Sequence, residues 1–338
     1  MGGEGVFLTF RIDAASKQTG PLYLAPMEGV TGYIYRRVHH EFFQPMDKYF
    51  IPFLSPTHSR SLKSRERAEI SPENNQGMRV IPQVLTNQAE DFLWTAGFLA
   101  ELGYQEINLN LGCPSGTVVS KGRGAGFLAR PEELERCLDQ IFSKVQVKVS
   151  IKTRIGIQSP EEFQVLLPLF NKYPLEELII HPRIRTDFYR NQPNLEVYQE
   201  AVESSKNPIC YNGDLFTLAD YQALRARFPD QKAVMLGRGL IANPGLAERL
   251  RGEEMLTKQR LRAFHDCLLQ KYRHVMSGER PVLFKMKELW YYMSHVFQDS
   301  ERYRKKIKKA GNLQEYGMAV DALFRERELS EAGFCAEK

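Results

Sequence analysis

The sequence of 338 residues lacks the marks of several classes of protein. It has no run of about 18 apolar residues, so we expect no membrane-spanning helix. Residues 1–20 lack the apolar core of a signal peptide, which predicts a cytoplasmic protein. The five cysteines include no C-x-x-C pair, so we expect neither a disulfide framework nor a metal site. With 43% hydrophobic and 26% charged residues and no low-complexity tract, the composition is that of a globular protein.

Positive charge is unevenly distributed along the chain. Residues 1–254 contain 29 Lys and Arg against 30 Asp and Glu, whereas residues 255–338 contain 17 against 11. The densest basic stretch is Arg302–Lys309, of sequence RYRKKIKK. Such a stretch is either the solvated face of a helix or an electrostatic footprint for a polyanion such as RNA.

Short apolar runs alternate with amphipathic stretches over the first 250 residues. The amphipathic stretches have recognisable helix starts, such as Pro131 with two following acids and Ser159 before Pro160. Alternating strands and helices predict a parallel sheet, and eight such units predict a closed (β/α)8 TIM barrel over residues 21–250, after an N-terminal extension of residues 1–20. The predicted strands are Leu22–Ala25, Lys48–Pro52, Val80–Leu85, Glu106–Leu109, Val147–Lys152, Glu177–His181, Pro208–Tyr211 and Ala233–Leu236.

Two segments depart from this alternation. Residues 55–77 are rich in Arg, Ser and Glu, and they are predicted to form an extended loop over the barrel mouth. From Met255 onward the apolar residues recur at helical spacing, interrupted by Gly278 and Gly311, and no strand is indicated. We therefore predict that residues 251–338 form a small all-helical C-terminal domain.

Polar residues and glycines follow the predicted strands at their carboxyl ends, where the active site of a TIM barrel lies. The loops after the seventh and eighth strands of such barrels commonly bind phosphate through backbone N–H groups that glycine leaves accessible. Asn212–Asp214 and Gly237–Gly239 occupy these two loops, and Arg238 adds a positive charge. We therefore predict a phosphate site there. The other strand ends carry Pro26–Gly29, Gln83, Asn110–Pro114, Lys152–Arg154 and His181–Arg183.

Six of these segments, together with one glycine-rich turn, form seven specific motifs. They are LAPMEGVT at 24–31, NLGCP at 110–114, GRGAGFL at 122–128, SIKTRIG at 150–156, HPR at 181–183, YNGD at 211–214 and LGRG at 236–239. In this order and spacing the motifs resemble those of the tRNA-dihydrouridine synthase family of the bacterial type. The resemblance covers about residues 20–250 and, more loosely, the C-terminal domain, and NLGCP with the glycine-rich turn after it is the most specific part.

The resemblance implies an FMN at the barrel mouth, reduced by NADPH, and transfer of hydride to C6 of a uracil in tRNA. It implies that Pro26 and Met27 lie against the isoalloxazine ring and that Gln83 hydrogen-bonds the pyrimidine edge of that ring. Lys152 is then expected to stabilise the reduced flavin from its N1 side, and His181 to complete that wall. The residues expected to hold the ribityl chain and the phosphate are Asn212, Gly213, Asp214, Gly237 and Arg238.

Cys113 is the candidate catalytic acid. Reduction of the C5–C6 bond of uracil needs a hydride at C6 and a proton at C5, and a thiol with a pKa of about 8.5 is mostly protonated at neutral pH. The alternative, a buried structural cysteine, is the expectation for Cys137, Cys210 and Cys267. The candidates for holding a flipped-out uracil or its phosphate are Asn110, Arg154 and Arg183. The two arginines have an alternative role as salt-bridged supports of the barrel rim.

The C-terminal domain is predicted to bind RNA, with tRNA as the first candidate. Arg302–Lys309, Lys285 and Lys287 supply charge for phosphates, and the aromatic run Trp290–Tyr292 supplies rings for exposed bases. One of Trp290 and Tyr291 must, however, face the core of the domain.

The HPR segment departs from the family pattern, because Pro182 and Ile184 replace a small residue and a threonine. The role of the following loop, through Tyr189 and Arg190, is therefore left open. Four alternative functions remain at this point. They are the same reaction on ribosomal RNA, a small-molecule FMN-dependent pyrimidine or ene reductase, a flavin-free Schiff-base aldolase that uses Lys152, and an RNA-binding protein without catalysis.

Overall fold

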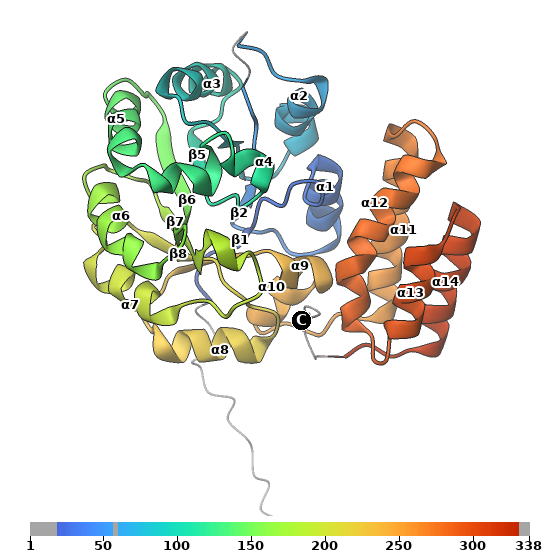
Figure 1. Ribbon diagram of the computed structural model, residues 1–338. Helices are drawn as coiled ribbons and strands as arrows, with labels where there is room; N and C mark the ends of the chain where they lie inside the picture. Colours follow the sequence, from blue (N-terminus) through green and yellow to red (C-terminus); the bar gives the residue numbers. More distant parts are fainter. Residues whose placement is uncertain (1–18, 57–59, 331–338) are drawn as a thin grey trace, which may run out of the picture.

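Residues 19–56 and 60–330 are described by the computed structural model, and within them all strands belong to one parallel sheet (Figure 1). The strand order is β3-β2-β1-β9-β8-β7-β6-β5-β4. The strands are β1 (Leu22–Leu24), β2 (Lys48–Phe50), β3 (Val80–Ile81), β4 (Gln83–Val84), β5 (Glu106–Leu111), β6 (Lys148–Gly156), β7 (Leu178–Ile184), β8 (Ile209–Tyr211) and β9 (Ala233–Leu236).

Pro82 explains why nine strands stand where eight were predicted. It separates β3, which pairs with β2, from β4, which pairs with β5. Proline has no backbone N–H to donate, so the ladder is interrupted at this residue, although its carbonyl oxygen accepts the N–H of Asn108 at 2.9 Å. The segment 80–84 thus closes the sheet on itself, and the predicted TIM barrel is confirmed.

Alternate residues of each strand face opposite sides of the barrel wall, as the period of a strand requires. Tyr23, Phe50, Ile179 and Met235 belong to a small buried cluster that fills the barrel. Their sequence neighbours, such as Leu24, belong to the larger core cluster that includes residues of the surrounding helices. The strands are therefore buried on both faces, which accounts for their continuous apolar runs.

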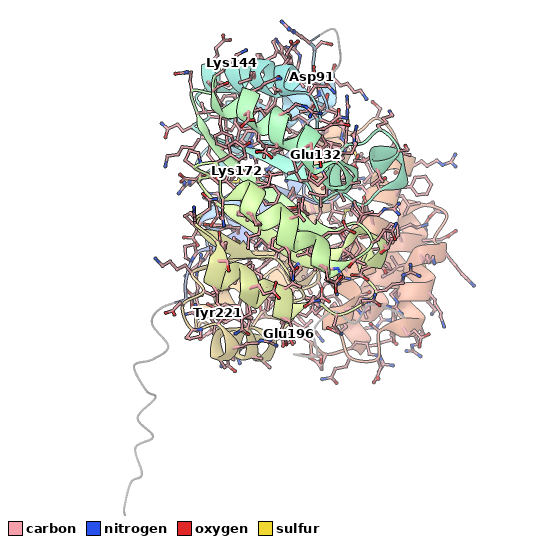
Figure 2. The ribbon with its side chains drawn as sticks, turned by 60° about the vertical axis from the view of Figure 1, so that its left-hand side comes forward. Asp91, Glu132, Lys144, Lys172, Glu196 and Tyr221 are labelled. Atoms are coloured by element: carbon pink, nitrogen blue, oxygen red, sulfur yellow. The ribbon has the colours of Figure 1, made fainter. Side chains whose placement is uncertain are left out.

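The helices around the barrel include α1 (Tyr33–Phe42), α3 (Ala89–Glu101), α5 (Pro131–Phe142), α6 (Phe163–Phe170), α7 (Leu195–Ser204), α8 (Leu218–Arg227), and the short α4 (Gly116–Val119), α9 (Arg238–Ala242) and α10 (Leu246–Leu250). Their starts follow local rules. Thr217 accepts the N–H of Asp220 at the start of α8, and Asn194 caps α7. On the outer face of these helices Figure 2 shows charged side chains such as Glu132 and Glu196.

The prediction that residues 55–77 form an extended loop was wrong. The segment contains α2 (Ser64–Ile70) and a 3-10 helix (Pro72–Asn75). The fully buried guanidinium of Arg36 on α1 holds both, since it donates to Glu69 Oε2 at 2.9 Å and to Asn75 Oδ1 at 2.9 Å. The segment looks loop-like in sequence because its ordering contact comes from a residue more than 30 positions away.

The C-terminal region consists of α11 (Lys258–Val275), α12 (Glu279–Met293), a 3-10 helix (Ser294–Val296), α13 (Glu301–Lys309) and α14 (Leu313–Glu326). Only an isolated bridge between Phe297 and Leu329 has strand geometry in the described part of this region. The helices lie beside the barrel in Figure 1, with α11 packed on α1 and α12 packed on α9. One contact in this interface is that of the Phe43 and Phe264 rings, whose centroids are 5.3 Å apart. The predicted all-helical character is confirmed, and the domain boundary at residue 250 stays a prediction.

In the described ranges 19–56 and 60–330, no helix is long and apolar enough to cross a membrane.

Candidate active site

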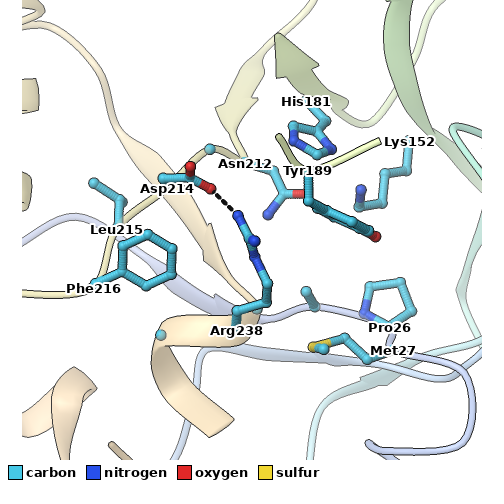
Figure 3. Close-up of a pocket in the computed structure, with 14 residues that line it drawn as sticks. Pro26, Met27, Lys152, His181, Tyr189, Asn212, Asp214, Leu215, Phe216 and Arg238 are labelled. Carbon is cyan, nitrogen blue, oxygen red and sulfur yellow. Dashed lines mark hydrogen bonds and ion pairs between the residues drawn. The ribbon is translucent and has the colours of Figure 1, made fainter. Parts of the chain in front are cut away.

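A pocket lies at the carboxyl ends of the strands, where the sequence placed the site (Figure 3). Lys152 of β6, His181 of β7 and the segments after β1, β7, β8 and β9 line it. The structure thus brings together all of the residues predicted to hold the cofactor except Gln83. The lining residues are Ala25, Pro26, Met27, Lys152, His181, Tyr189, Asn212, Gly213, Asp214, Leu215, Phe216, Gly237, Arg238 and Gly239.

Positive charge dominates this pocket. Asp214 accepts hydrogen bonds from both Arg183, at 3.0 Å, and Arg238. Among the described residues, Lys152 Nζ makes neither a hydrogen bond nor an ion pair. Burial, with the nearby charge of Arg154, lowers the pKa of Lys152 to about 8. The pocket lining therefore holds two cations, Lys152 and Arg238, and one carboxylate, Asp214, which makes the pocket suited to an anion.

His181 is neutral at physiological pH. Burial, followed by the charges of the surrounding lysine and arginines, holds its pKa well below the usual 6.5. Its Nε2 atom lies 3.1 Å from Nη1 of Arg183. Because a guanidinium only donates, Nε2 must be the acceptor, and we assign the ring proton to Nδ1.

Two glycines allow close contacts in the loops after β8 and β9. A Cβ atom on Gly213 would lie 2.0 Å from the hydroxyl oxygen of Tyr211, and one on Gly239 would lie 2.1 Å from the carbonyl oxygen of Leu215. A side chain at position 239 would push the two predicted phosphate-binding loops apart, and one at position 213 would displace the Tyr211 ring.

Cys113 lies in the loop after β5, beside this pocket. Burial raises the pKa of its thiol, and a hydrogen bond from the backbone of Ser115 opposes this shift. The charge of Glu28 raises the pKa by less, and those of Arg154 and Lys152 lower it. The thiol is therefore protonated at neutral pH. Within residues 19–56 and 60–330 this cysteine, like Cys137, Cys210 and Cys267, forms no disulfide.

The glycine-rich segment after Cys113 supports the loop. The N–H of Ala125 donates to the Cys113 carbonyl oxygen at 3.1 Å. Gly124 has φ +55°, and a Cβ atom there would lie 2.9 Å from the same oxygen. A residue with a side chain at position 124 would therefore be strained and would also displace Cys113.

A chain of side-chain amides runs from the barrel interior to Cys113. Asn108 Nδ2 donates to Ser150 Oγ at 3.0 Å, and Gln83 Nε2 donates to Asn108 Oδ1 at 2.7 Å. Asn110 Nδ2 donates to Gln83 Oε1 at 2.7 Å. Asn110 Oδ1 in turn accepts the N–H of Cys113 at 2.9 Å. Gln83 is fully buried and does not line the pocket, so its contact with a flavin stays a prediction.

Arg154 and Arg183, each 1% exposed, have several partners within the chain. Arg154 donates to the carbonyl oxygens of Gly112 at 3.1 Å, Ile184 at 2.8 Å and Phe188 at 2.7 Å. Arg183 donates to Asn191 O at 2.6 Å as well as to Asp214. These contacts favour the rim-support role for both arginines, and contact with the substrate stays a prediction.

Tyr189, Leu215 and Phe216 line the pocket although the sequence did not single them out as site residues. The Arg238 guanidinium carbon lies 4.8 Å from the centroid of the Tyr189 ring and 5.3 Å from that of Phe216. Phe188, just before Tyr189, has φ +52°. The aromatic residues sit in loops without periodicity, so no sequence signal beyond their nearness to HPR and NGD could have found them.

Over the described ranges 19–56 and 60–330, no group of three or more His, Cys, Asp or Glu side chains is arranged to hold a metal ion.

Comparisons with known proteins agree with the sequence motifs. The family described as dihydrouridine synthase matches residues 23–332. The tRNA-dihydrouridine(16) synthase of Cupriavidus necator is 29% identical over 68% of this chain and 73% of its own length. A probable tRNA-dihydrouridine synthase of Staphylococcus aureus (strain COL) is 30% identical over 74% of this chain and 77% of its own. The solved structure of morphinone reductase in complex with tetrahydroNAD aligns with 70% of this chain and 87% of its own, at 14% identity and a TM-score of 0.47.

Proposed function

The chain belongs to the dihydrouridine synthase family, and we therefore propose that it reduces the C5–C6 bond of a uridine in tRNA, with FMN as cofactor and NADPH as reductant. The predicted enzyme class, an oxidoreductase acting on a carbon–carbon bond, is confirmed by the family. The observation that carries the finer proposal is the protonated Cys113 thiol beside a pocket with excess positive charge. The choice of tRNA rests on the relatives, which are named for it.

The pocket fits a flavin mononucleotide in its chemistry. Pro26 and Met27 give it an apolar wall for a ring system, and Lys152 and Arg238 bring positive charge. Arg238 and the backbone of the loops at Gly213 and Gly237 would hold the phosphate, because closely packed glycine loops present N–H groups. A bound FMN would supply the hydride that the reduction needs.

The protein's own contribution is to hold charge and protons in place. Lys152 is mainly cationic below pH 8 and would stabilise negative charge near it. Cys113 Sγ carries the proton that C5 of the uracil needs, and its raised pKa keeps that proton in place until transfer. His181, neutral and fixed by Arg183, would offer its Nδ1–H as a hydrogen-bond donor.

RNA binding is assigned to the helical domain. Helix α13 carries the basic run, and Tyr291 is half exposed whereas Trp290 is buried. A uridine in folded RNA has to leave its stack before it can reach a pocket at the barrel mouth. The domain would therefore hold the RNA while the base is extruded.

The test is direct. The purified protein should carry flavin, and with NADPH it should form dihydrouridine in tRNA from cells that lack this gene, measured by mass spectrometry. Ribosomal RNA from the same cells and free uridine are run in parallel. Product in ribosomal RNA alone would move the target to that RNA, product from free uridine alone would make the enzyme a small-molecule reductase, and no product with any of them would refute the proposal.

A further inference from the structure

A second hollow lies on the helical domain, between α12 and α13, apart from the barrel-mouth pocket. Its volume is about 670 Å³. We call it the α12–α13 groove and define it by its lining residues. These are Pro281, Phe284, Lys285, Lys287, Glu288, Trp290, Tyr291, Arg304, Lys305, Ile307 and Lys308.

Cations outnumber anions in the groove. Five of the lining residues are Lys or Arg and only Glu288 is acidic. Some of these charges are already engaged, because Lys285 pairs with Glu288 at 2.8 Å and Lys305 pairs with Glu301 at the edge. The Lys305–Glu301 pair is exposed on both sides, so water and salt screen it strongly. Lys287 donates to the carbonyl oxygen of Ala310, and Arg304 lies 2.9 Å from His295 Nε2. The groove still has an excess of positive charge, which is complementary to phosphate.

Aromatic rings are exposed beside these cations. The side chain of Phe284 is 55% exposed and that of Tyr291 is 49% exposed. The buried Trp290 lies at the bottom of the groove, where its indole N–H donates to the Tyr316 hydroxyl at 2.6 Å. This hydrogen bond fixes the helix surface that carries the two exposed rings. Large exposed rings are costly in water unless a ligand covers them, and rings next to cations are typical of surfaces that bind unstacked bases.

The groove is continuous with the active-site side of the molecule. Lys285 Nζ donates to the carbonyl oxygen of Gly29, in the loop after β1 that also carries Pro26 and Met27. The Tyr291 ring contacts that of Tyr292, with centroids 5.0 Å apart. Tyr292 in turn lies near enough to Tyr189 of the barrel pocket for the two to interact electrostatically. A strand that leaves the pocket along these rings would reach the groove.

We propose that the α12–α13 groove binds unpaired nucleotides of the substrate RNA that flank the target uridine. Phe284 and Tyr291 stack on bases, and Arg304, Lys305 and Lys308 bind the phosphates between them. The proposal rests on the proposed function, since it names the part of the RNA that the helical domain holds.

Unpaired nucleotides fit better than a duplex. The bases of an A-form duplex are stacked on each other and shielded by the backbone, so they offer no free face to Phe284 or Tyr291. A duplex would use the lysines alone and leave both rings exposed. Unpaired nucleotides satisfy the rings and the cations together.

The experiment measures RNA binding by the full-length flavoprotein. The probes are a short fluorescein-labelled oligouridylate, an RNA duplex of equal length, and whole tRNA. The variants are Phe284→Ala, Tyr291→Ala and Lys308→Glu. The controls are Met318→Ala, which removes an exposed apolar side chain on α14, and Lys144→Glu, which reverses a charge on the outer face of the barrel (Figure 2).

Each ring variant should weaken oligouridylate and tRNA binding about tenfold or more and leave duplex binding unchanged, as loss of base stacking requires. Lys308→Glu should weaken binding and reduce the steepness of its salt dependence. Both controls should bind as the unmodified protein does, and flavin content and melting temperature should stay the same in all variants.

Two results would overturn the proposal. One is unchanged oligouridylate affinity in Phe284→Ala and Tyr291→Ala, which would leave the groove to a partner of another kind. The other is equal loss of duplex and single-strand binding, which would make the site a general phosphate surface. Neither result depends on catalysis. If the protein forms no dihydrouridine, the proposed function is refuted, and RNA binding at the groove can still be measured.

Discussion

The side-chain oxygen of Asn110 accepts the backbone N–H of Cys113 at 2.9 Å. A residue at the end of β5 therefore fixes the loop that carries the proposed proton donor. Its own amide is oriented by Gln83, which donates to Asn108 further inside the barrel. Two residues that the sequence assigned to substrate and cofactor thus also position the loop of Cys113.

Replacing Asn110 should impair the chemical step more than cofactor binding. Asn110→Ala removes the acceptor for the Cys113 N–H, and misplacement of a reacting group by about 1 Å costs on the order of 100-fold in rate. Single-turnover formation of dihydrouridine measures the effect, with flavin content as the reference. A rate equal to that of the unmodified enzyme would show that the loop needs no such support.

Cys113→Ala should reduce dihydrouridine formation by about 10²- to 10⁴-fold, the usual contribution of a general acid. Flavin content, tRNA affinity and oxidation of NADPH in the absence of RNA should be retained, because the thiol is proposed to act only on C5. Cys267→Ala, on α11, is the matched control and should be fully active. Full activity of Cys113→Ala would refute the acid role.

Gly124→Ala should mimic part of this loss without touching the thiol. The new methyl group would lie 2.9 Å from the Cys113 carbonyl oxygen at a residue with φ +55°. We expect a rate lowered at least about tenfold and a lower melting temperature, since such backbone strain costs on the order of 1–3 kcal/mol. Gly97→Ala in α3, where no atom lies within 4 Å of the added carbon, should be active and slightly more stable.

The affinity for FMN should fall as the pH rises through about 8. The pKa of Lys152 is lowered to about 8, so its ammonium is charged below that pH and neutral above it. Quenching of flavin fluorescence at pH 7 and pH 9 measures the dissociation constant. Lys152→Met should bind FMN more weakly and lose this step, and a pH dependence that persists in the variant would assign it to another group.

Lys48 inside the barrel should be critical for stability. Its ammonium lies 2.9 Å from Glu106 and 3.5 Å from Glu177, and all three are buried. Lys48→Met leaves buried Glu177 without a cation and leaves Glu106 with only the more exposed Arg79, at 3.5 Å, and it should destabilise the fold by about 3–5 kcal/mol. Lys144→Met on the surface is the control, with melting temperature as the measurement.

The same cluster predicts how stability depends on pH. Burial raises the pKa of Glu177 from 4.5 to about 7, so the folded state holds this proton more tightly than the unfolded state does. The protonated carboxyl of Glu177 therefore adds to the free energy of unfolding below about pH 4.5, and this addition is lost as the pH rises towards 7. Lys48→Met should make the fall of stability with rising pH steeper. Glu177→Gln should remove the part of the pH dependence of stability that Glu177 causes.

The sequence by itself determined the barrel and the strand ends. Strand period, helix starts and loop glycines are local properties, so the barrel strands could be located and Cys113, Lys152 and Arg238 placed at one end of them. It also determined the family, because the motifs are contiguous. Even the break at Pro82 has a local cause, the missing N–H.

Only the tertiary structure decided what individual side chains hold. Arg154 binds the carbonyl oxygens of Gly112 and Ile184, and Arg36 orders a segment that looks like a loop in sequence. Tyr189 enters the pocket from a loop without periodicity. A hydrogen bond between residues 30 or more positions apart depends on the path of the whole chain, and local composition carries no record of it.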